Sequence, residues 1–600
     1  MEESIKQGIS NALKSLYKHD LASADISLQP TRKEFEGTYT FVTFPLARVS
    51  RKSPEATGEE IGQFLVEHTA QVSAFNTVKG FLNISISETS QIGQFAAFFN
   101  AEDVSRSPLF QVEKTGKTIV VEYSSPNTNK PLHLGHLRNN FLGNSVSRIL
   151  EAAGNNVQKV QIINDRGIHI CKSMLAWQKF GEGETPESAG IKGDHLVGKY
   201  YVEFDKVYKA EIAHLIEQGV EKDKAEKEAP ILLEAQEMLK KWEAKDPEVY
   251  ALWEKMNGWV YDGFNSTYER IGVDFDKLYF ESDTYLIGRD RVMEGVEKGV
   301  FFKKEDGSVW VDLTNEGLDE KLLLRKDRTS VYMTQDIGTA LMRFDDFSGL
   351  DQLIYTVGNE QEYHFKVLFL ILKKLGYEWA EACYHLSYGM VDLPTGKMKS
   401  REGTVVDADD LIQEMVDTAK ARTEELGKID GFTDEQAKEL YEMLGLGAIK
   451  YYLMKVDPRK RMLFNPEESI EFQGNTGPFV QYTHARINAI LRKAEQLGID
   501  VKGINYDSIQ EVHQTEKDLI FALGQYQDKL NTAADTYSPA IIAQYVYDLA
   551  KDYNRFYTEL SIFNEDDKDV MRFRVSLSAL TAQTIKVSMG LLGIEVPNRM

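Results

Sequence analysis

Two histidines, three residues apart, are the side chains with the clearest capacity for chemistry in this chain. His133 and His136 flank Leu134 and Gly135. The four residues lie within the segment 124–140, which reads SSPNTNKPLHLGHLRNN. On a first helical turn, residues three apart project from the same side. Gly135 has no side chain, so a flat ligand can approach the backbone there. Imidazoles and free N–H groups at a helix N-terminus suit a polyphosphate, and we therefore expect a nucleotide site.

A basic, glycine-flanked loop forms the second chemical group. It reads GKMKSREG over residues 396–403 and follows an expected strand at 384–391. A loop of this kind after a late strand of an α/β sheet is suited to clamp phosphates. Each group alone is ambiguous, because histidine pairs are often structural or metal ligands and basic loops are often plain surface. Their order, about 260 residues apart, indicates one nucleotide held between both.

The segments around these groups alternate between strand and helix patterns. The expected elements lie, in chain order, at 117–123, 137–153, 159–163, 352–357, 361–375 and 384–391. A buried strand, a tight polar loop and a helix, in that order, form the front of a nucleotide-binding α/β unit. We therefore expect an α/β Rossmann-type catalytic domain over residues 111–406. A Glu- and Lys-rich segment, about 181–255, is expected to be a helical insertion on the surface.

The remaining residues predict two further kinds of domain, as the length of 600 residues requires. Residues 1–110 predict a small α+β N-terminal domain, with helices at 5–17 and 59–68 and strands at 37–46 and 80–86. From residue 407 onward the chain predicts only helices: a stem over 407–455 and an all-α bundle over 456–600. The expected helices lie at 407–427, 434–456, 473–497, 514–536, 538–562 and 567–592.

Composition excludes several classes of protein. The net charge of −23 argues against a general nucleic-acid coat and against a binder of anionic membranes, although it permits a local basic face. No apolar run approaches 18 residues, so no membrane span is expected. The two cysteines, Cys171 and Cys383, allow no disulfide framework and no paired-cysteine zinc site, which fits a reducing cytoplasm.

The motifs together resemble the arginyl-tRNA synthetases, a family of class I aminoacyl-tRNA synthetases, over essentially the whole chain. The matching stretches are VEYSSPNTNKPLHLGHLRNN at 121–140, SVYMTQDIGTAL at 330–341, YTVGNEQEYHF at 355–365, GKMKSREGTVV at 396–406, FQGNTGPFVQYTHARI at 472–487 and LLGIEVPNRM at 591–600. The last two belong to the C-terminal half of the family. A match of this extent disfavours a generic small-molecule nucleotidyltransferase.

The resemblance implies a two-step ligase. ATP, with Mg²⁺ as its substrate complex, and L-arginine form arginyl-adenylate and pyrophosphate, and arginine then passes to the 3′-terminal ribose of tRNA(Arg). It further implies an N-terminal domain that contacts the tRNA elbow, a helical anticodon-binding domain at 456–600, a monomer, and activation that requires bound tRNA. No tightly bound metal or organic cofactor is expected. The rivals are another class I synthetase, such as the cysteinyl enzyme, and a non-catalytic tRNA-binding paralogue.

By resemblance, one set of residues serves ATP. The expected ATP contacts are His133, Gly135, His136, His364, Met398 and Ser400. Ser400 stands where the family's basic loop usually has a lysine. Because a fixed cation near the α-phosphate stabilises developing charge, we expect Lys130 to take over part of this role; the alternative is an ordinary surface lysine. The expected catalytic residues are Lys130, His133, His136, Lys397, Lys399 and Arg401.

Two further sets serve arginine and tRNA. A guanidinium needs carboxylates that hold its planar fork, and the expected contacts are Glu122, Asn127, Tyr332, Asp336 and Gln361. The alternatives are a helix N-cap for Asp336 and a core position for Tyr332. Asp165 either orients the site or is a turn residue. The expected tRNA contacts are Arg459, Arg461, Gln481, Tyr482 and Arg486, and for each of them taken singly the alternative is a solvated helix face.

Overall fold

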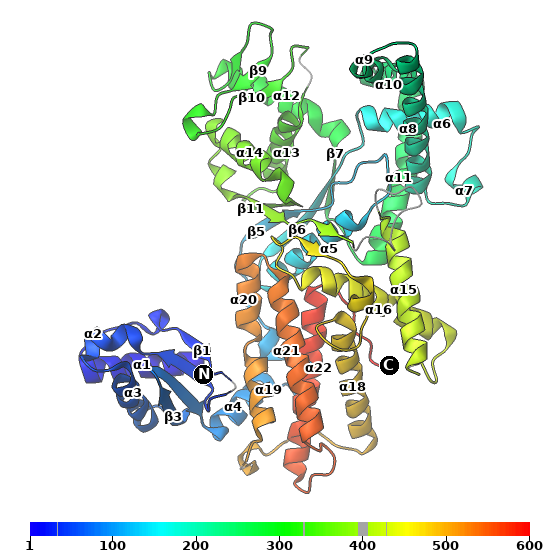
Figure 1. The fold of residues 1–600 in the computed structure, drawn as a ribbon. Coiled ribbons are helices and arrows are strands. Elements are labelled where there is room, and N and C mark those ends of the chain that lie inside the picture. Colours follow the sequence, from blue (N-terminus) through cyan, green and yellow to red (C-terminus); the bar gives the residue numbers. More distant parts are fainter. Residues whose placement is uncertain (33, 328–329, 394–405, 428, 510) are drawn as a thin grey trace.

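A computed structural model of the chain describes residues 1–32, 34–327, 330–393, 406–427, 429–509 and 511–600. A parallel sheet lies at the centre, with two groups of helices on one side of it and a long helical bundle on the other (Figure 1). The N-terminal domain extends sideways from the bundle (Figure 1). The expected three-part architecture, with an α/β catalytic domain, a small N-terminal domain and a helical C-terminal part, is therefore confirmed.

The central sheet has five parallel strands in the order β12-β11-β5-β6-β7. Their bounds are β5 Thr118–Glu122, β6 Asn156–Ile163, β7 Lys277–Phe280, β11 Leu350–Gly358 and β12 Cys383–Tyr388. The chain starts in the middle, moves to one edge and then crosses back, which is the doubly wound order. The direction of winding reverses between β5 and β11. In such sheets the ligand crevice opens at that reversal, beyond the carboxyl ends of the strands.

Three helices connect these strands and frame the crevice. They are α5 (Leu134–Ala152), α13 (Tyr332–Asp346) and α14 (Glu362–Lys374). Helix α5 is buried on nearly every side, because one face covers the sheet and another packs against the C-terminal bundle. One continuous hydrophobic core therefore runs from the sheet into the bundle. This packing fixes the start of α5, where the histidine motif lies.

The N-terminal domain has its own core. Its antiparallel sheet has the order β1-β2-β4-β3 and is covered by α1 (Glu2–Tyr17) and α3 (Pro54–His68). The strands are β1 Leu28–Pro30, β2 Tyr39–Val42, β3 Val72–Val78 and β4 Phe81–Ile86. The short helix α2 (Ala47–Ser50) lies at the end of the domain away from the bundle (Figure 1). Helix α4 (Glu88–Phe98) connects the domain to the bundle through α19.

The predicted insertion at about 181–255 is helical, with α8 at Gly193–Glu217, α10 at Pro230–Glu243 and the first part of α11 at Pro247–Ile271; α6 at Ile168–Phe180 precedes it. The expectation that it lies only on the surface is wrong at the start of α8, where Asp194 is fully buried. A second layer was not predicted: α12 (Glu281–Glu297) packs on α13 beside a small antiparallel sheet of β8, β9 and β10. Its strands are β8 Phe302–Lys303, β9 Val309–Val311 and β10 Lys321–Leu324.

The C-terminal part consists mainly of helices, as predicted. They are α15 Ala408–Glu425, α16 Asp434–Met454, α18 Gly477–Gln496, α19 Gln514–Gly524, α20 Tyr526–Thr536, α21 Pro539–Glu559 and α22 Lys568–Leu591. The expected single helix at 514–536 is two helices, with the break at Gln525 between α19 and α20. In the described parts of the chain, no helix has the length and apolar character to cross a membrane.

Candidate functional site

The chain turns sharply off β5 at Ser124, whose φ of 59° is in the left-handed region. Its backbone N–H donates to Oδ1 of Asn139 at 2.6 Å, and its hydroxyl lies 2.7 Å from Oη of Tyr268. Such a conformation costs about 1–3 kcal/mol and persists only where neighbouring contacts impose it. The following loop is tied to the end of β6, because the Thr128 N–H donates to the Asn164 carbonyl at 3.1 Å. The loop therefore crosses the carboxyl edge of the sheet.

His133 and His136 together cap the start of α5. The Gly135 N–H donates to Nδ1 of His133, and the His133 N–H donates to Nδ1 of His136, both at 3.1 Å. The two rings lie 3.9 Å apart. Because both Nδ1 atoms accept, each neutral ring carries its proton on Nε2. The Gly135 N–H is therefore used within the cap, and a Cβ at this position would lie only 3.0 Å from the His133 ring.

The surroundings keep both imidazoles neutral. Burial lowers the pKa of His133 to about 4, with a further contribution from the charge of Lys130. Burial, His133 and Lys130 also lower the pKa of His136 well below its ordinary value. Lys130 itself is partly buried, and among the described residues it has no ion-pair partner. The edge of the sheet thus offers two neutral N–H donors and one ammonium group that is available to an anion.

Asp336 of α13 and His364 of α14 are in direct contact. Nε2 of His364 lies 2.5 Å from Oδ2 of Asp336. Asp336 is not an N-cap, because α13 already begins at Tyr332 and its cap is Val331. Tyr332 is 76% exposed, which excludes a core position. Asn127 and Gln361, expected to contact arginine, are also exposed.

Glu122 does not face solvent at the end of β5. It is 5% exposed, and its carboxylate is paired with the guanidinium of Arg343 from α13. Burial raises the pKa of Glu122, and Arg343 opposes that rise. The charge of Asp336 adds to the rise in the pKa of Glu122. The carboxylate that was expected to hold substrate is thus already bound to an arginine of the chain itself.

A second acidic residue, Glu281, was missed by sequence reasoning. It begins α12, directly after the carboxyl end of β7, and is only 8% exposed. Burial raises its pKa to about 7, Arg166 opposes the rise, and Asp165 and Asp336 add to it. Its side chain is hydrogen-bonded to Gln335. A buried carboxylate beside Asp336 creates a pocket that favours a cation.

Asp165 holds this pocket in place. Its carboxylate accepts hydrogen bonds from the Ser282 backbone N–H at 2.9 Å, the Ser282 hydroxyl at 2.7 Å and Oη of Tyr261 at 3.1 Å. Ser282 follows Glu281 in α12, so Asp165 fixes the position of Glu281. The orienting role is therefore the better interpretation of Asp165 than a plain turn residue. For Glu281, the signal in the sequence is an acidic residue directly after a strand, but that strand, β7, has only four residues.

The basic loop with Lys397, Met398, Lys399, Ser400 and Arg401 lies outside the described residues. The segments on both sides of it are described. Before it, β13 (Val391–Asp392) pairs with β14 (Met462–Leu463). After it, the Leu134 N–H donates to the Val406 carbonyl at 3.1 Å, beside the histidine motif.

The residues expected to bind tRNA differ in exposure. Gln481 is wrong as a tRNA contact: it is fully buried, and its amide donates to the carbonyls of Met443 and Glu595. Arg486 lies over the ring of Tyr482, 4.9 Å from its centre. Arg459 and Arg461 are exposed near the sheet.

A cleft of about 1440 Å³ separates the N-terminal domain from the bundle. Its lining comes from the N-terminal domain, from α19, α20 and α21, and from the segment before β14, where it includes Arg459. Both signs of charge occur on its walls, with Arg32 and Lys529 on opposite sides and Asp548 and Asp552 along α21. The residues that line this cleft do not include the histidine motif, Glu281 or Asp336.

Comparison with known proteins gives the same architecture. Family models match residues 104–465 (tRNA synthetases class I (R), catalytic domain), 480–600 (DALR anticodon binding domain) and 3–86 (arginyl tRNA synthetase N terminal domain). The chain is 56% identical to an arginine–tRNA ligase of Bacteroides fragilis and to one of Bacteroides thetaiotaomicron, over the full length of each. Its fold resembles the arginyl-tRNA synthetase of Thermus thermophilus, with a TM-score of 0.76 at 23% identity and complete coverage of both chains. The chain belongs to the arginyl-tRNA synthetase family of class I aminoacyl-tRNA synthetases.

Proposed function

We propose that this chain joins L-arginine to tRNA(Arg) in two steps, through an arginyl-adenylate. One observation carries the proposal: a neutral histidine cap at the start of α5 and an acidic pocket around Asp336 open at the same edge of one parallel sheet. The first feature suits a polyphosphate and the second suits a guanidinium. The names of the full-length relatives, which are 56% identical, support the same activity.

In the first step the arginine carboxylate attacks the α-phosphate of ATP, and pyrophosphate leaves. His133 and His136 donate Nε2–H bonds to phosphate oxygens without changing their own charge, because both pKa values lie well below neutrality. Lys130 supplies the positive charge beside them. A fixed cation and oriented donors stabilise the charge that develops on the phosphate, and this accounts for most of the expected rate gain. Mg²⁺ enters with ATP and is held mainly by the phosphates.

The acidic pocket selects arginine. Asp336 and Glu281 meet the guanidinium, and Tyr332, Gln361 and Asn127 line the approach. A lysine ammonium cannot form the planar two-pronged contact, and a neutral urea analogue gains nothing from the carboxylates. Discrimination of this kind rests on buried polar groups that are left unpaired by the wrong substrate, so it requires no editing site.

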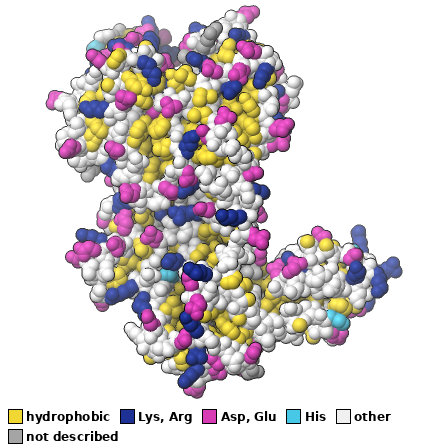
Figure 2. All heavy atoms as spheres, turned by 180° about the vertical axis from the view of Figure 1, so that it is seen from behind, with side chains coloured by type: hydrophobic (Ala, Val, Ile, Leu, Met, Phe, Trp, Pro, Cys, Tyr) yellow, Lys and Arg dark blue, Asp and Glu magenta, His cyan; other side chains and the backbone are white. Residues whose placement is uncertain are grey.

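In the second step a terminal ribose hydroxyl of the tRNA attacks the activated carbonyl. Arg48, Arg51 and Lys52 are exposed at α2, and Figure 2 shows Lys and Arg side chains at that free end of the N-terminal domain. This position suits contact with the tRNA elbow, while Arg486 and Tyr482 in α18 suit contact with splayed loop bases. The protein acts as a monomer in the cytoplasm, and adenylate forms only when tRNA is bound.

Two assays test these proposals. A charging assay over twenty amino acids with total tRNA should register arginine alone, and charging of any other amino acid would reassign the pocket. Exchange of pyrophosphate into ATP should require both arginine and tRNA. Robust exchange with arginine and no tRNA would contradict the requirement for bound tRNA, and it would leave the ligase activity itself intact.

A further inference from the structure

The first turns of insertion helix α8 lie directly against the catalytic stretch. A Cβ added at Gly198 would lie 2.8 Å from Cδ of Pro131 and 3.6 Å from Cα of Lys130. On its other side, a Cβ at Gly193 would lie 2.0 Å from the carbonyl oxygen of Trp259 in α11. The start of α8 is thus wedged between α11 and the segment that carries Lys130. Such close backbone approach is what glycine permits.

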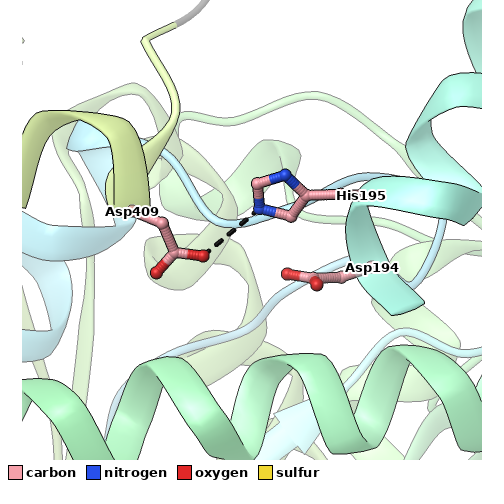
Figure 3. Close-up of side chains that lie close together, drawn as sticks. All are labelled: Asp194, His195 and Asp409. Atoms are coloured by element: carbon pink, nitrogen blue, oxygen red, sulfur yellow. Dashed lines mark hydrogen bonds and ion pairs between the residues drawn. The ribbon is translucent and has the colours of Figure 1, made fainter. Parts of the chain in front are cut away.

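A partly buried ionic cluster, here called the latch, fastens this end of α8 to the start of α15. The latch comprises Lys192, Asp194, His195, Thr267, Asp407 and Asp409. Figure 3 shows the His195 ring pointing toward the Asp409 carboxylate, with Asp194 close by. Nε2 of His195 lies 3.2 Å from Oδ2 of Asp409 and 3.5 Å from Oδ2 of Asp407.

Lys192 supplies positive charge to the latch. Its ammonium lies 2.6 Å from Oδ2 of Asp409, 2.6 Å from Oγ1 of Thr267 and 3.5 Å from Oδ2 of Asp194. Asp194 is fully buried, and within the described parts of the chain neither of its carboxylate oxygens has a hydrogen-bond partner. One ammonium and one imidazole therefore face three carboxylates in a partly buried cluster. Removing one member leaves its partners less well compensated, so each member helps to hold the arrangement.

The far side of the latch reaches the histidine motif. Residues 406–408 run antiparallel to residues 132–134, with His133 opposite Asp407. The Leu134 N–H donates to the Val406 carbonyl at 3.1 Å, and the Ala408 N–H donates to the Leu132 carbonyl at 3.0 Å. The Asp407 carboxylate also caps α15, accepting from the Asp409 N–H at 2.9 Å.

A divalent cation is the competing interpretation of the latch. The ligand atoms of Asp194, His195 and Asp409 lie within 4.8 Å of one another, as in a metal site. However, the Lys192 ammonium already lies at hydrogen-bond distance from Oδ2 of Asp409 and faces Asp194. An ammonium among the carboxylates supplies the compensating charge and repels a second cation. The positions of these groups therefore favour a protein-only ionic cluster.

We propose that the latch and Gly198 make α8 a brace, which holds Lys130 and His133 in position for attack on ATP. His195 is thus a positioning residue: it acts through Asp407 and the paired segment 406–408, and it touches no substrate. The insertion then has a role in the first step of the reaction, beyond covering surface. The expected effect on kcat rests on the proposed function, whereas the expected effect on the hydrogen exchange of residues 132–136 does not.

The test compares His195→Ala, His195→Gln and Gly198→Ala with wild type. His195→Ala removes the ring that links Asp407 and Asp409, whereas glutamine can return an N–H donor to the position of Nε2. His214→Ala is the matched control, because His214 is an exposed histidine on the same helix. Pyrophosphate exchange by wild type in the presence of tRNA tests the proposed function. The ratios of kcat between variants and wild type test the brace.

We expect His195→Ala and Gly198→Ala to lower kcat for activation about tenfold or more, since small misplacements of reacting groups carry such costs. KM for arginine and for tRNA should stay within about twofold of wild type. His195→Gln should recover most of kcat, and His214→Ala should equal wild type. Independently of activity, hydrogen exchange should accelerate in residues 132–136 of His195→Ala.

Three results would overturn the brace. The first is unchanged kcat and unchanged hydrogen exchange in Gly198→Ala and His195→Ala. The second is a kcat loss that His195→Gln does not relieve. The third is a rise in the melting temperature of wild type on addition of Zn²⁺ or Mn²⁺, absent in His195→Ala, which would make the cluster a metal site. If His195→Ala fails to fold, the kcat and the hydrogen exchange of Gly198→Ala decide whether α8 acts as a brace.

Discussion

Nε2 of His364 lies 2.5 Å from Oδ2 of Asp336, so a carboxylate suited to a guanidinium already has a neutral or cationic partner in the chain. The sequence assigned these two residues to different substrates, His364 to ATP and Asp336 to arginine. Their contact joins the two expected subsites. One oxygen of Asp336 is engaged, so a two-pronged contact with arginine requires His364 to turn aside or to share that oxygen.

Replacing Asp336 by asparagine should weaken arginine binding by about 2–4 kcal/mol, because a charge-assisted fork is lost while the size of the side chain is kept. His364→Asn should change arginine affinity by less than about 1 kcal/mol, since only one hydrogen bond within the chain is removed. KM for arginine, measured by pyrophosphate exchange with tRNA present, reports the effect of both substitutions. Asp290→Asn, at an exposed aspartate of α12, is the control. An unaltered KM in Asp336→Asn would move the guanidinium site elsewhere.

Glu281 should make arginine binding depend on pH near neutrality. Its pKa is raised to about 7 by burial, so in the free enzyme it is ionised mainly above pH 7. Arginine is a cation at all these pH values and favours the ionised form. Arginine affinity should therefore fall as pH drops from 8 to 6 in wild type, and it should be weaker but nearly independent of pH in Glu281→Gln. A wild-type pH profile in the Gln variant would contradict this role.

The same residue should cost stability at high pH. A carboxyl group whose pKa is higher in the folded than in the unfolded state stabilises the fold below its unfolded value and loses that contribution as pH rises through the folded value. Glu281→Gln should thus be more stable than wild type at pH 8, by on the order of 2 kcal/mol without arginine. The gain should vanish at pH 4, where both side chains are neutral. Melting temperatures at the two pH values measure the difference.

Lys130→Ala should lower kcat for activation by about 10²–10³-fold and leave KM for arginine nearly unchanged. The reason is that Lys130 lacks an ion-pair partner among the described residues and lies beside two neutral imidazoles, so it supplies the positive charge on that side of the site. Lys114→Ala, at an exposed lysine before β5, is the control. A rate like that of wild type in Lys130→Ala would leave this charge to the loop at 396–403.

Gly135→Ala tests the histidine cap. An added Cβ would lie 3.0 Å from the His133 ring, so the ring must move and its Nε2–H loses its direction. We expect kcat to fall at least tenfold with little change in melting temperature, because the cap is at the end of a long, well-packed helix.

Since both histidines titrate far below neutrality, kcat of wild type should be flat between pH 6 and 8. A kcat limb near pH 6.5 would show that an imidazole changes charge in the reaction.

The sequence predicted the elements that carry a strong local pattern. The β-branched run before Ser124 becomes β5, and the long apolar periodicity after it becomes α5. Strands of two to four residues, such as β7 and β8, have too few side chains for a period to be seen, and they were missed. Glu281 was overlooked for that reason, because it follows β7.

Pairing between distant residues was beyond sequence reasoning. Glu122 has the position of a substrate ligand at the end of a strand, and nothing near it in the chain reveals that Arg343 neutralises it. Gln481 did have a usable signal. It lies one residue after Val480 and three before His484, on the buried part of the helix. Its amide therefore needs hydrogen-bond partners inside the bundle.

The Glu122–Arg343 pair leads to the last prediction. Both side chains are buried, and Arg343 also lies between the rings of Tyr279 and Tyr355, 5.3 Å from each centre. Arg343→Met or Glu122→Gln alone should each cost about 3–5 kcal/mol, because one buried group is left without its partner. The double variant should cost less than the sum of the two. Urea midpoints measure these costs.

Kinetics separate this structural role of Glu122 from a direct contact with substrate. If Glu122 serves only Arg343, then Glu122→Gln and Arg343→Met should alter KM for arginine to a similar extent, since both act by loosening α13, the helix that carries Asp336. A direct contact predicts instead that Glu122→Gln alone raises KM, by the 1.5–3 kcal/mol or so of a hydrogen bond to a charged group. Because Arg343 already occupies the carboxylate, we expect the first pattern.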